Sequence, residues 1–469
     1  MKHNEYHRYH IETKTVPDIT RWPNRFSVKV QRHRLFFFLI EEIIRHRMRR
    51  KVILSRPCIY EVYSRPVGGM APREHMCVGC LRCTTEHPDW VKVERNPEFY
   101  KQGDSYFTAE QIDAVHYEAQ TGRIPVKGAG FRGKFGGQGW DSMWTDMSEI
   151  VRPTRDGIHG REFISTVVDI GEKPAFLTFD DKGLPAGKTP AVASIPLPIL
   201  FDVPPESVAS QVLLTILTEA ARESETLAIV PIAAIRKFGF SGSHIVPLVS
   251  SEEGDILHSL PFEPKMIEIS GWDKELYEKI RSRFPSSQVW LRFSFEEHLP
   301  EKLLRYADSG IHIFHLTADY HGRGQNGAFM LDLIRQAHQS FVNVGCRDEV
   351  TLLGSGGIVA AEHVPKAIIC GLDAVALDTS LLIALEAKMF GECTDRTTSK
   401  FRFTKKIDVT WGVQRLKNLL ASWRDQMLEV LGAMGLREVR RLRGEIGRAL
   451  FQKDLEHEVF TGITGYEEE

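Results

Sequence analysis

The sequence has no long hydrophobic run and no excess of charge of either sign. Its 60 Lys and Arg residues nearly balance 62 Asp and Glu residues, which leaves a net charge of −2 over 469 residues. Nucleic-acid binding needs a clustered positive surface, so this balance gives no reason to expect a nucleic-acid partner. The apolar run from Leu35 to Ile40 is far shorter than the ~20 residues that span a bilayer, so no transmembrane segment is expected.

Cysteine is also scarce, and a secretory signal is lacking. Residues 1–14 are polar throughout and have no apolar core of the kind that directs export, which predicts a cytoplasmic chain. The seven cysteines are an odd number, so a framework of disulfides is not expected.

Three of the cysteines form the run Cys77-Val-Gly-Cys80-Leu-Arg-Cys83. This C-x₂-C-x₂-C spacing lets three thiolates face one iron–sulfur cluster. In the bacterial ferredoxin pattern the next ligand follows four residues later and precedes proline, and here that position is His87-Pro88. The predicted ligands of an iron–sulfur cluster are therefore Cys77, Cys80, Cys83 and His87.

Other interpretations of the cysteine run stay open. The cluster could be [4Fe–4S] with His87 or the remote Cys58 as the fourth ligand, or [3Fe–4S] on three thiolates. The same residues could form a Cys₃His zinc site, or they could be buried cysteines without a metal.

The charges are unevenly distributed along the chain. Between Arg21 and Arg56 eleven Lys and Arg residues stand against two Glu residues, so a basic segment precedes an acidic remainder. We predict a basic N-terminal arm with a helix over residues 1–70. Its arginine-rich face would dock on the acidic body, stay solvated, or bind a partner subunit or a membrane surface.

A second region, residues 71–165, combines the cysteine run with a stretch rich in glycine, arginine and tryptophan. The run from Gly128 to Gly139 holds too many glycines for regular structure. Its aromatic residues favour an ordered connector that packs on another domain over a flexible linker.

From about Pro190 onward, eight apolar runs rich in β-forming residues alternate with stretches at helical spacing. This β-α-β-α order predicts a parallel sheet, and eight units predict a (β/α)₈ barrel over residues 166–400. An open doubly wound sheet is the alternative, because the gap within 225–250 is short for a crossover helix. The strand candidates are 191–200, 226–232, 244–250, 265–270, 288–294, 311–318, 349–354 and 373–379.

The last region, residues 401–469, predicts helices packed outside the barrel. Apolar residues at helical spacing extend from Trp411 towards Phe451. The arginine-dense run 437–443 is interpreted as a solvated or interdomain face.

A glycine-rich loop, Gly354-Ser355-Gly356-Gly357-Ile358, follows the seventh strand candidate. Small residues let backbone N–H groups approach an anion, and the N-terminus of a following helix adds a partial positive charge. The eighth strand candidate ends in Asp378-Thr379-Ser380, so both loops that bind phosphate in barrel enzymes carry small residues. This arrangement favours a phosphorylated cofactor over a phosphorylated substrate or a simple tight turn.

These segments resemble the FMN-binding domain of glutamate synthases, in the short, stand-alone form of bacteria and archaea. The resemblance covers roughly residues 75–450 and is carried chiefly by 354–385, by the strand 289–292 and by 411–415. It implies FMN as cofactor, with Arg292 where the family has a strand lysine near the flavin ring. The residues implied to bind the cofactor are Gly354, Ser355, Gly356, Gly357, Gly371, Asp378, Thr379 and Ser380.

The sequence also departs from the family. Residue 2 is Lys and no N-terminal nucleophilic cysteine is present, so this chain alone should not hydrolyse glutamine. The family's glycine-rich substrate loop is rewritten as 319–327 and gains His321 and Arg323. The family's cysteines after the phosphate site are missing, which leaves Cys393.

The leading hypothesis is an oxidoreductase in which an iron–sulfur cluster passes single electrons to FMN and reduced FMN gives a hydride to a 2-iminoglutarate-like imine, forming glutamate. Arg292 would tune the flavin, while His321 and Arg323 would reach a 2-oxoglutarate-like substrate. His321 could equally be a hydrogen-bonded loop histidine. We expect an oligomer or a complex, in which another subunit supplies ammonia or electrons. The alternatives are a non-catalytic or regulatory flavoprotein subunit and a reductase of another small acid or amine.

Overall fold

A computed structural model describes residues 9–49, 52–53, 58–63, 71–125, 137–145, 164–173, 176, 178–186 and 192–465. The chain forms two compact units. The smaller is formed mainly by residues 19–113, and the larger contains 9–18, 114–124 and 137–465. Most of the predicted glycine-rich connector, 126–136 and 146–163, lies outside the described residues. The three predicted boundaries between the four domains stay predictions.

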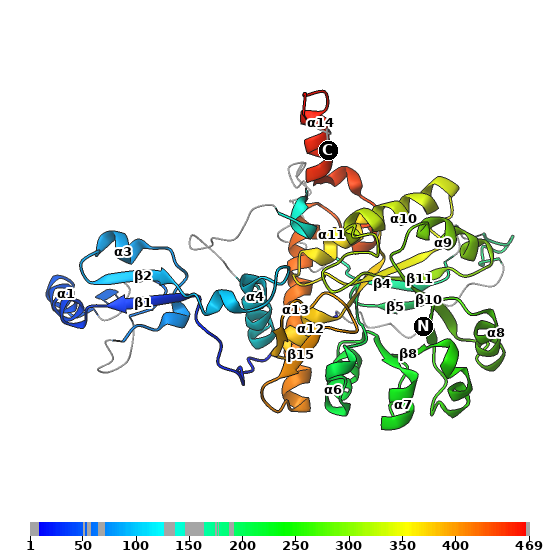
Figure 1. The fold of residues 1–469 in the computed structure, drawn as a ribbon, viewed down its shortest axis with the longest axis horizontal. Coiled ribbons are helices and arrows are strands. Elements are labelled where there is room, and N and C mark those ends of the chain that lie inside the picture. The colour runs from blue at the N-terminus through cyan, green and yellow to red at the C-terminus, as the bar shows by residue number, and fades with distance from the viewer. Residues whose placement is uncertain are drawn as a thin grey trace. The chain divides into compact units, whose positions relative to one another are not determined.

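Eight parallel strands of the larger unit close into a barrel, in the order β10-β11-β12-β13-β6-β7-β8-β9 (Figure 1). Each overlaps one of the eight predicted runs, so the (β/α)₈ barrel is confirmed and the sheet is closed rather than open. The strands are β6 (Ile199–Phe201), β7 (Ala228–Pro231), β8 (Ile245–Val249), β9 (Met266–Ser270), β10 (Gln288–Ser294), β11 (Ile313–Thr317), β12 (Thr351–Ser355) and β13 (Ala374–Leu377).

Helices connect the strands outside the barrel, and their caps and apolar faces follow from the sequence. Ser210 accepts the Leu213 N–H at the start of α6, and Asp273 accepts the Leu276 N–H at the start of α8. The short 225–250 gap is bridged by a helix of only seven residues, α7. The connecting helices are α6 (Gln211–Glu223), α7 (Ile232–Phe238), the 3₁₀ segment η6 (Ser251–Ser259), α8 (Lys274–Arg283), α9 (Leu299–Asp308), α10 (Met330–Val344), α11 (His363–Cys370) and α12 (Thr379–Ala384).

An antiparallel pair, β4 (Val168–Gly171) and β5 (Val192–Ile195), precedes the first barrel strand. Thr351, the first residue of β12, donates its hydroxyl to the Gly171 carbonyl at 2.8 Å. The pair therefore packs at the N-terminal end of the barrel. A second antiparallel pair, β14 (Ala387–Phe390) and β15 (Lys400–Phe403), follows α12, and its connecting loop is residues 391–399.

Charged side chains also meet at the N-terminal end of the barrel. Asp373, just before β13, lies 2.9 Å from Arg347, 2.8 Å from Arg443 and 3.1 Å from Lys173. Arg443 belongs to the arginine-dense run, which forms the 3₁₀ turn η7 (Val439–Leu442). Arg443 is half-buried, because it pairs with the buried carboxylate of Asp373, whereas Arg437, Arg440 and Arg441 of the same run are exposed as predicted.

The C-terminal extension lies outside the barrel, as predicted. Its main helix, α13 (Val409–Ala433), packs on α6, and α14 (Gln452–Phe460) follows the pair β16 (Ala449–Phe451) and β3 (Met143–Thr145). The helix α4 (Ala109–Thr121) enters the larger unit at Ala114. The Asn418 amide of α13 donates to the carbonyls of Lys14 and Ala119, and the Val16 N–H donates to the Gln120 carbonyl at 2.8 Å.

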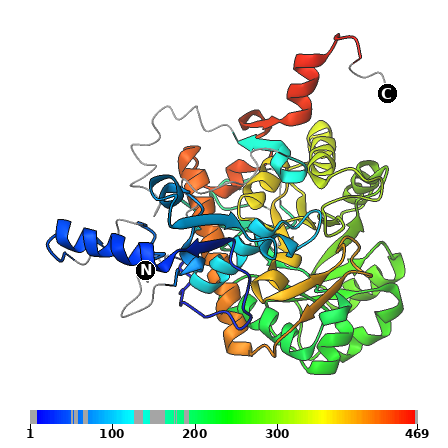
Figure 2. The ribbon, with the colours of Figure 1, turned by 60° about the vertical axis from the view of Figure 1, so that its left-hand side comes forward.

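The smaller unit has an antiparallel pair, β1 (Phe26–Val30) and β2 (Val91–Arg95), beside the predicted basic helix α1 (Arg32–Arg45), the dark-blue helix of Figure 2. Further elements are η1 (Glu74–Met76), α3 (Arg82–Glu86) and η2 (Phe99–Lys101). Its core includes Val28, Leu35, Val62, Tyr63, Cys83, Trp90 and Val91. Five apolar side chains of α1 are exposed: those of Phe36, Phe37, Ile40, Ile43 and Ile44.

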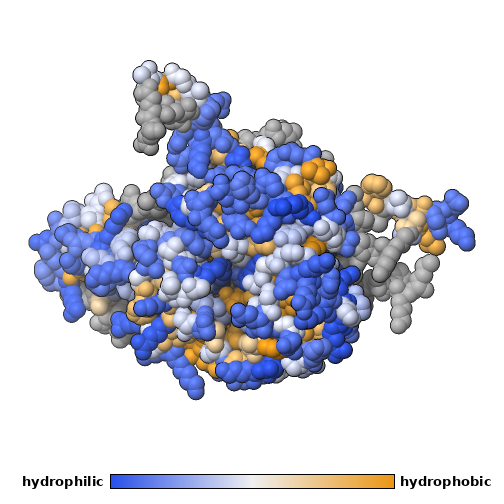
Figure 3. Space-filling model, turned by 45° about the vertical axis from the view of Figure 1, so that its right-hand side comes forward, coloured by the Kyte–Doolittle hydropathy of each residue, from blue (hydrophilic) through white to orange (hydrophobic). Residues whose placement is uncertain are grey.

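Hydrophilic residues cover most of the face that Figure 3 shows, and apolar residues lie between them in separate groups. Within the described residues, none of the helices combines the length and the apolar character that crossing a membrane requires.

Candidate functional site

The glycine-rich loop lies where the sequence predicted it, at the carboxyl end of the seventh barrel strand. Gly356 has a φ of +100°, and a Cβ there would lie 2.4 Å from the Asp319 carbonyl oxygen. The Gly357 N–H donates to the Tyr320 carbonyl, and its own carbonyl accepts the Trp140 indole N–H at 3.1 Å. Glycine is needed at 356 because the loop passes directly against the chain that follows β11.

The helix after this loop starts later than the motif suggests. α11 begins at His363, because Val359 donates its N–H to His363 Nδ1 and a turn intervenes. The helix N-terminus therefore does not follow the glycines directly.

The predicted residues after the eighth strand join the same end of the barrel. Asp378 caps α12 by accepting the Thr379 N–H, and the side chains of Asp378, Thr379 and Ser380 are buried. The structure does not bring Gly371 to them. Gly371 precedes β13 instead of following it, and a Cβ there would meet His338 at 2.3 Å.

Charged residues from several strands meet inside the barrel, at and below its C-terminal mouth. Glu268 is on β9, Arg292 on β10 and His315 on β11. His315 Nδ1 lies 2.6 Å from Glu268 Oε1, and Arg292 Nε lies 3.7 Å from the same oxygen. The Arg292 guanidinium also pairs with Asp202, the residue after β6. The predicted flavin-tuning residue is thus held by two buried carboxylates.

Arg396, in the loop 391–399, extends this set across the mouth. Its guanidinium lies 3.2 Å from Asp202 Oδ2 and 2.8 Å from Asp378 Oδ2, and it donates to Ser355 Oγ at 3.0 Å and to the Ala318 carbonyl at 2.7 Å. We call the six side chains of Asp202, Glu268, Arg292, His315, Asp378 and Arg396 the mouth network.

The two aspartates of the mouth network differ in their pKa. Burial alone would raise the pKa of Asp202, but Arg292 and further cationic groups hold it well below its usual range. Burial, with Asp202 nearby, raises the pKa of Asp378 although Arg396 opposes the shift. The carboxylates of Asp202 and Glu268 outweigh the effect of burial on Arg292 and raise its pKa.

Four members of the mouth network, Asp202, Glu268, His315 and Arg396, were missed by the sequence analysis. Glu268 and His315 carried a signal, since each is the single charged or titratable residue of its strand, β9 and β11 respectively. Arg396 carried none, because a polar loop gives an arginine no pattern against which it stands out.

The residues around the glycine loop fit a phosphate group such as that of FMN. Ser380 Oγ is buried and has no hydrogen-bond partner among the described residues, and the Ser355 hydroxyl and the Arg396 guanidinium lie together beside the glycines. Hydroxyl and guanidinium donors are the groups that bind phosphate oxygens.

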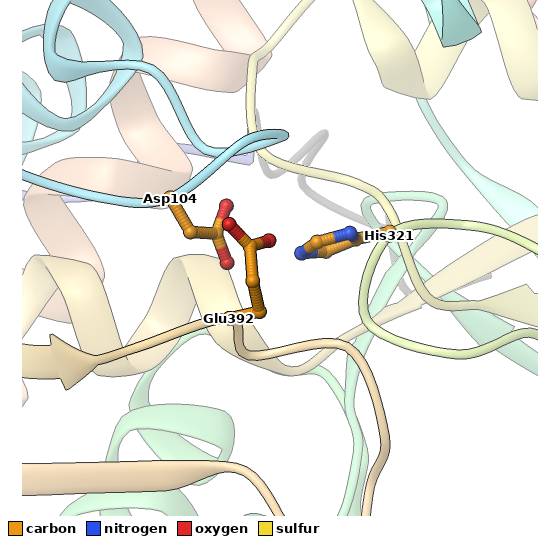
Figure 4. A group of neighbouring side chains, drawn as sticks. All are labelled: Asp104, His321 and Glu392. Carbon is orange, nitrogen blue, oxygen red and sulfur yellow. The ribbon is translucent and has the colours of Figure 1, made fainter.

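In the rewritten loop after β11, His321 is buried and Arg323 is exposed. Arg323 is exposed; its N–H donates to Asp319 Oδ1 at 2.7 Å and its Nη1 to the Gly327 carbonyl at 2.9 Å. His321 is buried and its Nδ1 lies 3.5 Å from Thr394 Oγ1, in the same loop as Arg396. Figure 4 shows His321 directed towards Glu392, with ligand atoms within 4.8 Å; Asp104, also drawn, belongs to the smaller unit.

The predicted cysteine ligands lie in the smaller unit. Cys83 is part of its core, and both Cys77 and Cys58 pack against that core. Gly79 and Leu81 are left-handed, with φ of 69° and 61°, so the loop curls between its cysteines.

Backbone N–H groups point at two of these sulfurs. The Tyr60 and Val62 N–H groups donate to Cys58, and the Gly79 N–H donates to Cys77. Burial raises the pKa of the Cys77 thiol to about 11.

His87 has aromatic neighbours. Its ring stacks on Trp90 with a centroid distance of 5.1 Å and meets the edge of Phe38 at 4.6 Å. The structure therefore gives His87 a packing role beside the cysteine loop.

Comparison with known proteins identifies relatives of this chain. Residues 318–437, which include the glycine loop and Arg396, match the conserved region in glutamate synthase. The archaeal-type glutamate synthase (NADPH) of Dehalococcoides mccartyi is 24% identical over 87% of this chain and 94% of its own length. The archaeal glutamate synthase (NADPH) of Archaeoglobus fulgidus is 24% identical over 92% of this chain and 98% of its own length.

The chain is similar to archaeal-type glutamate synthases over most of its length. The predicted resemblance is thereby confirmed, as is the prediction that the chain is an oxidoreductase. Among the solved structures, mandelate oxidase aligns with 64% of this chain and 97% of its own chain, at 15% identity and a TM-score of 0.38. The recombinant flavin-binding domain of baker's yeast flavocytochrome b2 aligns with 75% of this chain and 81% of its own, at 10% identity and a TM-score of 0.41.

Proposed function

We propose that the chain forms glutamate by reducing a 2-iminoglutarate-like imine at the barrel mouth, with FMN as the bound cofactor. The observation that carries this proposal is the glycine loop, Gly354 to Gly357, which lies at the end of the seventh strand within the segment that matches the glutamate synthase family. Ser355, Gly356 and Gly357 would hold the phosphate, together with Thr379 and Ser380 after the eighth strand.

When bound, FMN would supply hydride-transfer chemistry to the site. The chain's own residues would bind the cofactor and the substrate and orient them. Arg292 keeps its charge at every physiological pH, because two carboxylates stabilise the guanidinium, and it offers a fixed cation beneath the mouth. Arg323 is exposed on the loop after β11, so its guanidinium can meet a carboxylate that arrives from solvent.

We further propose an iron–sulfur cluster on Cys77, Cys80 and Cys83, with Cys58 rather than His87 as the fourth ligand. Cys58 packs against the same core as Cys77 and accepts two backbone N–H groups, which is how proteins hold cluster sulfurs. His87, by contrast, is stacked on Trp90. The cluster would supply single-electron transfer to the flavin.

A partner subunit that supplies electrons or ammonia would bind at the exposed apolar face of α1. Phe37 is 67% exposed and Ile44 is 76% exposed, while arginines flank them on the same helix. Exposed apolar side chains at this density are typical of an interaction surface.

Anaerobically purified protein tests the proposed reaction. After reduction of the bound flavin with an artificial donor, 2-oxoglutarate and ammonia together should speed its reoxidation, and amino-acid analysis should find glutamate. Neither compound alone should do so. Unchanged reoxidation without glutamate, in protein loaded with FMN, would contradict the proposal.

A second candidate, a reductase of another small carboxylated compound, is favoured by the rewritten loop 319–327. The exposed Arg323 selects for a carboxylate but not for one particular acid. A panel of 2-oxo acids in the same assay distinguishes the two.

A further inference from the structure

Arg396 differs from the rest of the mouth network in its origin. The other five members lie on barrel strands or directly after them, whereas Arg396 comes from the loop between β14 and β15. Its guanidinium nevertheless bonds to four groups at the mouth, those of Ala318, Asp202, Asp378 and Ser355.

Arg396 is also the accessible member of its ion pairs. Its side chain is 25% exposed, whereas those of Asp202 and Asp378 are fully buried. The Tyr320 ring lies 5.0 Å from the guanidinium and supports its outer position. An anion that enters from solvent therefore meets Arg396 before it meets either carboxylate.

The charges at the mouth make this cation necessary. Asp202, Glu268 and Asp378 are three buried acidic groups, and Asp378 lies beside Ser355 through their shared partner Arg396. A phosphate or carboxylate in the glycine loop would be repelled by Asp378 if Arg396 were absent. Ser380, two residues after Asp378, has a buried hydroxyl without a hydrogen-bond partner in the described part of the chain, so it is available to a ligand.

We propose that Arg396 is the anion-binding residue of the barrel mouth, and that the phosphate or carboxylate of the ligand replaces Asp378 as its partner. Asp378 is the carboxyl best suited to release Arg396, because its raised pKa lets it become neutral more readily than Asp202. This inference deepens the proposed function, but it rests only on the mouth binding an anionic ligand and not on that ligand being FMN.

Calorimetric titration of the full chain tests the proposal with three probes: FMN, riboflavin, which lacks the phosphate, and 2-oxoglutarate. Arg396→Gln should weaken binding of the anionic ligand at least tenfold and leave riboflavin unchanged. Arg396→Lys should lie between, since lysine keeps the charge but not the planar donor fork. Asp378→Asn should tighten binding of the same anion, because it removes a competing carboxylate. Arg402→Gln, on the exposed face of β15, is the matched control and should bind like wild type.

The results separate this inference from the cofactor assignment. If Arg396→Gln weakens 2-oxoglutarate but wild type does not bind FMN, the inference holds and the flavin assignment fails. If both anions bind Arg396→Gln as they bind wild type, or wild type binds neither, the inference is overturned. Should circular dichroism show Arg396→Gln unfolded, Arg396→Lys and Asp378→Asn decide in the same way.

Discussion

His315 Nδ1 lies 2.6 Å from Glu268 Oε1, although the strand β10 separates the two strands that carry them. Both side chains are fully buried, so they meet inside the barrel rather than along the sheet. Arg292 of β10 approaches the same Glu268 oxygen. Three successive strands thus share one carboxylate in a region that water does not reach.

We expect Glu268→Leu to lower the free energy of unfolding by about 3–5 kcal/mol, because it leaves buried His315 and Arg292 with fewer partners. Urea denaturation measures the effect. The control is Glu275→Leu, which removes an exposed carboxylate paired with Lys279 and should cost less than about 1 kcal/mol. Similar losses of unfolding free energy in the two variants would show that the buried ion pairs of Glu268 contribute no more to stability than an exposed pair.

Gly356→Ala should destabilise the protein by about 3 kcal/mol or more, since it combines a left-handed φ with a Cβ placed 2.4 Å from a carbonyl oxygen. Gly239→Ala is a matched control: it has a φ of +71°, but its Cβ would meet none of the described atoms within 4 Å, so about 1 kcal/mol is expected. Thermal unfolding of both compares a clash plus strain with strain alone. Equal decreases in the Tm of the two variants would mean that the loop at Gly356 moves enough to relieve the clash.

Cys58→Ala should change the cluster from four irons to three per chain, or abolish it, whereas His87→Ala should leave the iron content unchanged. Iron and acid-labile sulfide assays with electron paramagnetic resonance provide the readout. Loss of iron in His87→Ala with full retention in Cys58→Ala would assign the fourth ligand to His87. Zinc in place of iron in wild type would refute the cluster itself.

At the other end of the barrel, we expect a pH dependence of stability from Asp373. Burial alone would raise its pKa, but Arg347, Lys173 and Arg443 hold it below its ordinary value of about 3.9. A depressed folded-state pKa means that the stabilisation is complete above about pH 4 and is lost as the pH falls further.

Asp373→Asn tests this directly. It should lower stability at pH 7 by about 3–5 kcal/mol, because buried Arg347 loses its carboxylate, and it should flatten the fall in stability below pH 4. Denaturation between pH 2.5 and 7 provides the comparison. A variant with the same acid slope as wild type would rule Asp373 out as its source.

The barrel was predictable because its signal is local. Apolar runs such as 288–294 alternate with amphipathic stretches, and each strand or helix can be recognised from the pattern of about ten consecutive residues. The mouth network was not predictable in the same way, because Arg396 and Asp202 are 194 positions apart in sequence. Gly371 shows a third case: it adjoins the correct strand, but a strand of four residues is enough to carry it to the opposite end of the barrel.

The hydrogen bond between the Val16 N–H and the Gln120 carbonyl joins the chain just before it leaves for the smaller unit to the chain just after it returns. The side-chain amide of Asn418 in α13 holds these two chain segments together, because it donates to the carbonyls of both Lys14 and Ala119. The chain segments that lead to and from residues 19–113 therefore meet on the larger unit, and the entropic cost of closing the loop between them grows only slowly with its length. Such a connection would allow the inserted residues to be replaced by another domain or by a short turn, while the eight barrel strands keep their order.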